Sequence, residues 1–130
     1  MTYILKTEVS DISPGILFTA IAPQLKGETR IRSGNTVYIW FFESPRNGPS
    51  GAGLVARGVI EAVETIYDSK NLRLNIRVSE RISRSGFGIQ QLMENIAGFG
   101  PLERKIRGYS HKQIRSITEQ EASLLSQSFA

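Results

Sequence analysis

The sequence predicts an α+β fold, in which about five short strands form a curled sheet or small barrel together with two or three short helices. Short runs of β-branched and aromatic residues are separated by Gly and Pro, which is typical of strands joined by turns. Other segments carry apolar residues at helical spacing. The chain has 130 residues, an ordinary length for one domain, so we expect a single domain spanning 1–130.

The first quarter of the chain is predicted to hold one strand followed by one helix. Residues 3–7 are typical of an opening strand. Ser13 and Pro14 stand in the order of a helix N-cap and a first helical residue, where Pro is favoured. Apolar residues then follow at helical spacing over 16–21, so we expect a helix that ends by Pro23.

Three strands are predicted in the middle of the chain. Residues 36–42 are apolar on both faces, which indicates a central strand buried on both sides. Residues 54–64 resume the sheet after a loop rich in Gly and Pro, with a bulge or bend at Gly58. In 72–82 apolar residues alternate with polar ones, so one face joins the core and the other presents arginines.

The last third is predicted to contain a helix, a short strand and a closing helix. Apolar residues over 89–96 follow the i, i+3, i+4, i+7 spacing, and Gly98 stands where a C-cap glycine is favoured. Residues 114–117 are typical of a short strand. Thr118 and Glu121 have the spacing of a capping box at the start of the final helix.

The composition excludes several classes of protein. The chain has no cysteine and one histidine, so we expect no disulfide framework, no metal and no cofactor. A catalytic triad would have to join His111 to a distant aspartate, and no phosphate-loop or dinucleotide motif occurs, so we predict that the protein is not an enzyme. No stretch approaches the roughly 20 apolar residues that cross a bilayer, and the first ten residues lack a signal-peptide profile. We therefore expect a cytoplasmic protein that binds no membrane.

The positive charge is concentrated in one part of the chain. The net charge is +4, yet residues 70–115 carry ten basic and three acidic residues, a local charge of +7. Eleven of the 16 cations are arginine, which binds phosphate through two hydrogen bonds and stacks on flat rings. This asymmetry indicates a polyanionic partner. The alternative is an ordinary solvated charged face.

Four segments, in the same order along the chain, resemble the sequence pattern of EVE domains, a branch of the PUA-like superfamily. Residues 3–8 (YILKTE) resemble the family's W-L-F-K-T-E start, and residues 34–40 (GNTVYIW) its G-D-x-V-x-F-Y strand. Residues 53–60 (GLVARGVI) are similar to G-I-V-G-x-A-x-V, and residues 102–122 to the closing segment. Residues 27–32 correspond only loosely to the family's W-D-G-V-R-N segment.

The resemblance implies a PUA-like pseudo-barrel of five to six mostly antiparallel strands with two or three short helices. It also implies a pocket beside the first strand and the loops, in which related domains hold a flipped or unpaired nucleobase, often a modified one. Base recognition of this kind needs an apolar slot, a few hydrogen-bonding groups and cations for the flanking phosphates.

The candidate pocket residues combine rings, polar groups and two cations near the predicted strand ends. The predicted base or ligand pocket comprises Lys6, Thr7, Trp40, Phe42, Arg84, Ser85 and Phe87. Each has a plainer interpretation: core packing for Trp40 and the other rings, an ordinary turn for 84–88, and an ordinary strand end for Lys6 and Thr7.

The candidate phosphate ligands are basic residues of the +7 segment. They are Arg77, Arg81, Arg104, Lys105, Arg107, Lys112 and Arg115, and a solvated surface is the alternative for all of them.

The sequence thus predicts a non-catalytic module that binds DNA or RNA and recognises a base, modified or unmodified, as a monomer or weak homodimer. Two alternatives stay open. A small-molecule sensor would use the same pocket for a nucleoside-like ligand, and a protein-interaction module would use its apolar helix faces instead.

Overall fold

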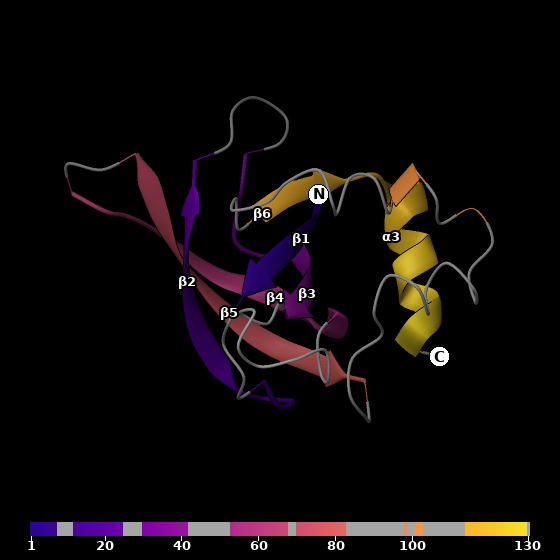
Figure 1. Ribbon diagram of the computed structural model, residues 1–130. Coiled ribbons are helices and arrows are strands. Elements are labelled where there is room, and N and C mark those ends of the chain that lie inside the picture. The colour runs from indigo at the N-terminus through magenta and orange to yellow at the C-terminus, as the bar shows by residue number, and fades with distance from the viewer. Residues whose placement is uncertain are drawn as a thin grey trace, which may run out of the picture.

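The computed structural model describes residues 1–7, 12–24, 30–41, 53–67, 70–82, 98, 101–102 and 114–129. Within these ranges one six-stranded sheet has the order β2-β5-β4-β3-β1-β6, followed by one α-helix and a short 3-10 turn (Figure 1). The elements are β1 (Thr2–Thr7), β2 (Leu17–Pro23), β3 (Thr36–Phe41), β4 (Gly53–Thr65), β5 (Asn71–Arg81), β6 (Ile114–Ile117), α3 (Glu119–Ser126) and η2 (Gln127–Phe129).

The pairing of the strands is mostly antiparallel, as predicted. Only β1 and β3, neighbours inside the sheet, run parallel within the described part of the chain. The long β4 and β5 bend strongly in Figure 1, and their register shifts twice: one shift leaves Ser79 as an extra residue in β5, and the other leaves Glu61 as an extra residue in β4. The sheet therefore curls towards a half-barrel.

The predicted helix over residues 16–21 is wrong, because this segment forms strand β2. Pro14 and Gly15 form a tight turn: the Ile16 N–H donates to the Ser13 carbonyl over 3.0 Å, and Gly15 has φ of 86°. Pro followed by a left-handed Gly is the signature of a type II turn, and the same Ser-Pro pair can precede a helix. The strand then alternates exposed and buried residues along its pairing with β5.

Strand β3 is buried on both faces over residues 37–40, which confirms the prediction for this part of 36–42. Val37 and Ile39 belong to a core cluster on one face of the sheet, and Tyr38 and Trp40 belong to a second cluster on the other face. The second cluster includes Leu125 of α3. The central strand thus separates two apolar cores, one inside the curled sheet and one beneath the C-terminal helix.

Strand β5 shows the predicted alternation, with its even-numbered apolar residues buried and its arginines exposed. Gly58 lies at the predicted irregularity of β4, where the register with β5 shifts. A Cβ at Gly58 would overlap the carbonyl oxygen of Arg77 and lie 3.1 Å from its carbonyl carbon. The absence of a side chain at Gly58 therefore permits the close approach of β4 and β5.

The C-terminal helix begins with the predicted capping box. The Glu121 N–H donates to the Thr118 hydroxyl over 3.1 Å, and the Thr118 N–H donates to a Glu121 carboxylate oxygen over 2.9 Å. The Tyr38 hydroxyl donates to the Ala122 carbonyl over 3.2 Å, and the Arg57 guanidinium lies 4.8 Å from the ring centre of Phe129. These contacts fix α3 and η2 against β3 and β4, on the far side of the molecule from β2 (Figure 1).

The helix predicted over residues 89–96 lies outside the described ranges. Gly98, which follows it, has φ of 81°, the left-handed conformation expected for a C-cap glycine. No helix within the described ranges is long and apolar enough to cross a membrane. No group of three or more His, Asp or Glu side chains in that part of the chain could hold a metal ion.

Gly58→Ala should lower the free energy of unfolding by about 1–3 kcal/mol, because the added methyl group forces β4 and β5 apart. Urea unfolding measures this change. An unchanged midpoint would contradict the close approach of the two strands.

Candidate nucleic-acid interface

The predicted pocket residues on β1 and β3 lie at one end of the sheet. Because these two strands are parallel, their carboxyl ends lie side by side, and Lys6 is paired in register with Trp40. Arg81, the last residue of β5, lies opposite Ala56, in the part of β4 that pairs with the end of β3. The structure therefore brings Lys6, Thr7, Trp40 and Arg81 to one end of the sheet, which we call the strand-end edge.

Two polar side chains end β1 at this edge. Thr7 is 8% exposed, and among the described residues it is the one polar residue that is buried. Lys6 is half-buried, and burial lowers the pKa of its ammonium group because the charge is poorly solvated there. A hydroxyl and an ammonium group in a partly dry setting can hydrogen-bond a planar ligand more strongly than in water.

Trp40 is buried in the second core cluster. It is 6% exposed and packs with Ile4, Leu54 and Ile82 among others. Its partner on the same face is Tyr38, whereas Ile39 faces the other core, as strand geometry predicts. Most of the indole surface therefore stabilises the fold.

Several predicted site residues lie outside the described ranges. For the pocket these are Phe42, Arg84, Ser85 and Phe87, and for the phosphate contacts they are Arg104, Lys105, Arg107 and Lys112. In the sequence, Phe42 directly follows β3, and Arg84 follows β5 by three residues.

Among the predicted phosphate ligands, Arg77 is held by a neighbouring carboxylate. Its guanidinium donates to both carboxylate oxygens of Glu61 and, over 2.8 Å, to the Gly15 carbonyl. The hydrogen bond from Arg77, together with its charge, lowers the pKa of Glu61. Arg77 thus ties β5 to β4 and to the turn that precedes β2.

The other arginines of the described ranges differ in their contacts and exposure. Arg73 lies 3.5 Å from a Glu64 oxygen, and Arg57 lies 2.6 Å from a Glu80 oxygen. These pairs fit the alternative of a solvated charged face for most of β5. Arg81 is exposed and forms no ion pair with any residue in the described ranges, and Arg115 is exposed on the edge strand β6.

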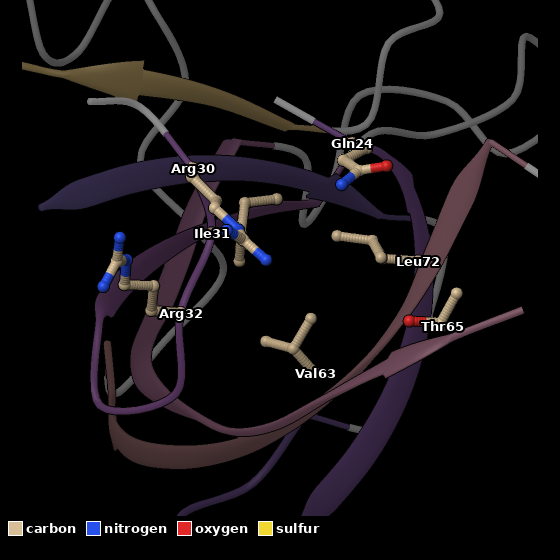
Figure 2. A pocket seen from close by; sticks show the side chains of 7 residues that line it. All are labelled: Gln24, Arg30, Ile31, Arg32, Val63, Thr65 and Leu72. Carbon is tan, nitrogen blue, oxygen red and sulfur yellow. The ribbon is translucent and has the colours of Figure 1, made fainter. Parts of the chain in front are cut away.

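A hollow of about 350 Å³ lies at the opposite end of the sheet, where β4 and β5 extend beyond β3. We call it the arginine hollow. It is lined by Gln24, Arg30, Ile31, Arg32, Val63, Thr65 and Leu72 (Figure 2). Figure 2 shows Gln24, Leu72 and Val63 around the opening, with Arg30 directed towards it from the facing segment.

Two hydrogen bonds hold the segment that carries Arg30 and Arg32 in place. The buried Tyr3 hydroxyl donates to the Arg30 carbonyl over 2.9 Å, and the Arg32 N–H donates to the Asn35 side chain over 2.8 Å. Burial raises the pKa of Tyr3, and the nearby charge of Arg32 partly offsets this rise. Sequence reasoning missed this site, although the order Arg30-Ile31-Arg32, one buried apolar residue between two exposed cations, was a usable signal.

No protein-family model and no curated protein matches the sequence. Solved structures match over its whole length. A Pseudomonas putida protein has a TM-score of 0.66 at 12% identity, with 100% of both chains covered. Protein PSPTO5229 from Pseudomonas syringae has a TM-score of 0.64 at 13% identity, with 98% of this chain and 99% of that chain covered. Human THYN1, crystallised with DNA containing 5-methylcytosine, has a TM-score of 0.60 at 11% identity, with 99% of this chain and 98% of that chain covered.

The chain shares the fold of these solved structures. The curled, mostly antiparallel sheet and the C-terminal helix agree with the fold class predicted from the sequence. In this fold the strand-end edge includes the end of the YILKTE segment, and the arginine hollow includes the end of the segment 27–32.

Trp40→Ala should lower the free energy of unfolding by about 3–5 kcal/mol, because it leaves a large cavity in the second core cluster. Trp40→Phe, which retains most of the apolar surface, should lower the free energy of unfolding by a smaller amount. Urea unfolding of the two variants measures both changes. Native stability of Trp40→Ala would instead indicate that the ring is dispensable for packing.

Arg77→Gln should raise the pKa of Glu61 towards its ordinary value of 4.5, because the hydrogen bond that favours the carboxylate is lost. The intact pair stabilises the fold at neutral pH, and this contribution disappears as the pH falls through the lowered pKa. NMR titration of the Glu61 carboxyl carbon measures the shift. An unchanged pKa would show that the two side chains do not interact in solution.

Proposed function

We propose that this chain is a non-catalytic module that binds nucleic acid and recognises a base, modified or unmodified, at the strand-end edge. The observation that carries the proposal is the fold likeness, over 99% of the chain, to human THYN1 in complex with DNA containing 5-methylcytosine. The proposed module is a single domain spanning 1–130 that acts as a monomer or weak homodimer.

The strand-end edge supplies groups suited to a base. Lys6 lies on the same face of the sheet as Trp40, and Thr7 lies on the other face, so their ammonium and hydroxyl groups border the strand-end edge from its two sides. Each can hydrogen-bond the edge of a base. Because Trp40 is largely buried, we assign the stacking role to Phe42 and Phe87, which follow β3 and β5 in the sequence. Stacking on an aromatic ring contributes roughly 1–3 kcal/mol per base. Arg84 and Ser85 complete the proposed pocket.

The proposed phosphate contacts come from the +7 segment. Arg81 and Arg115 are the exposed members of the described set, whereas Arg77 is bound to Glu61. Arg115 lies opposite Ile4 on β1, and Arg81 lies two strands away from β3, opposite Ala56. Arg104, Lys105, Arg107 and Lys112 extend the proposed contact along the nucleic-acid backbone.

Arg81→Gln should weaken the binding of DNA and reduce the slope of log affinity against log salt by about 1, because one phosphate contact is lost. Fluorescence anisotropy with labelled duplexes, with and without 5-methylcytosine, measures affinity at several salt concentrations. Arg73→Gln is the matched control, since it removes the same charge from the same strand at a position paired with Glu64.

The same titration with RNA and with single-stranded DNA identifies the preferred nucleic acid. No binding to any of them, or binding without a salt slope, would contradict the proposal. Stabilisation by free nucleosides without affinity for oligonucleotides would favour the small-molecule sensor.

Glu61 reports whether Arg77 joins the interface. If Arg77 turns to a phosphate, Glu61 loses its partner and its pKa rises when DNA is added. If the pKa of Glu61 stays low in the complex, Arg77 does not contact the DNA and only links β5 to β4 and to the turn before β2.

A further inference from the structure

The arginine hollow combines two cations with an apolar floor. Arg30 and Arg32 are exposed, and neither forms an ion pair with any residue that the structure describes. None of the seven lining residues is acidic. The unneutralised guanidinium groups therefore favour an anion at this place, and their planar donor pattern suits phosphate.

The walls of the hollow suit a planar ring. Ile31 and Leu72 are buried members of the core inside the curled sheet, and Val63 packs against that core, so the floor is apolar. Gln24 and Thr65 are exposed at the rim and provide an amide and a hydroxyl group. An amide both donates and accepts hydrogen bonds, which matches the edge of a nitrogen heterocycle.

The size and rigidity of the hollow also fit a small ligand. Its volume of about 350 Å³ falls in the range of small-molecule sites, roughly 300–1,000 Å³. The hydrogen bonds from Tyr3 to Arg30 and between Arg32 and Asn35 hold one wall. The Gln24 N–H donates to the Lys70 carbonyl over 3.2 Å and holds the other. A site fixed in this way loses little entropy when it binds.

We propose that the arginine hollow binds a nucleotide, with the heterocycle on Ile31, Val63 and Leu72, the base edge at Gln24, and the phosphate at Arg30. Arg32, whose side chain points away from the other lining residues in Figure 2, adds positive charge beside the site. The site is separate from the strand-end edge. Leu54, near that edge, and Val63 are nine positions apart in β4, which is at most about 30 Å of strand. The nucleotide can be free or part of a single strand, and the two sources share this chemistry.

Isothermal titration calorimetry of the full chain tests the site. The probes are adenosine 5′-monophosphate and cytidine 5′-monophosphate, with adenosine and inorganic phosphate as partial ligands. We expect a mononucleotide to bind about tenfold or more tightly than either partial ligand, because only the nucleotide engages both the floor and the arginines. Equal affinity for inorganic phosphate would overturn the proposal, since it would indicate an anion site without ring recognition.

Arg30→Gln should weaken nucleotide binding by about 10- to 100-fold, the effect of losing a hydrogen bond to a charged group, and Arg32→Gln should weaken it less, because only a nearby charge is lost. Arg73→Gln, which removes the same charge from the outer face, should leave it unchanged. An equal loss in Arg73→Gln would overturn the proposal, because the effect would then come from overall charge.

A single-stranded oligonucleotide distinguishes the two sources. Binding of the free mononucleotides identifies a soluble ligand. Binding of the oligonucleotide alone, lost in Arg30→Gln, identifies a nucleotide within a strand. No binding of either kind overturns the proposal. The proposed function is tested separately, since its duplex titration depends on Arg81: failure at the hollow with Arg81-dependent DNA binding would leave that function intact.

Discussion

The parallel pairing of β1 with β3 is the constraint on which the rest of the structure depends. Two parallel neighbours cannot be joined by a hairpin, so the chain between them must cross the sheet, and here it forms β2 at the far edge against β5. The detour curls the sheet and encloses the first core. The other face of β1 and β3 is left to α3, whose Leu125 joins the second core.

The same pairing separates two chemically different ends of the sheet. The carboxyl ends of β1 and β3 place Lys6 beside Trp40 at the strand-end edge. At the other end the segment that leads into β3 carries Arg30 and Arg32 across the mouth of the curled sheet. One end thus has polar groups against buried apolar residues, and the other has two open cations above an apolar floor. A flat ligand with a polar edge suits the first, and a flat ligand with an anionic tail suits the second.

The arginines show how tertiary contacts change the meaning of a charge pattern. The +7 segment indicates a polyanionic partner or a solvated charged face, and on β5 the carboxylates of Glu61 and Glu64 engage Arg77 and Arg73. These carboxylates lie on β4, outside the +7 segment. Pairing across strands therefore neutralises part of the segment, whereas Arg81 is exposed at the end of β5. Fewer arginines of β5 are available to a ligand than the sequence count indicates.

By itself the sequence determined the features that depend on neighbours a few residues apart. The alternation in β5, the two-sided β3 and the capping box of Thr118 and Glu121 follow from side-chain periodicity and local hydrogen bonds. The tertiary structure decided what depends on partners distant in the chain. Ser13-Pro14 fits a helix start as well as a turn, and the pairing of β2 with β5 selects the turn. The arginine hollow joins β2, β4, β5 and the segment before β3, so no local pattern contains it. Register across the sheet, and not the sequence of any one strand, determines which arginines are paired and which are open.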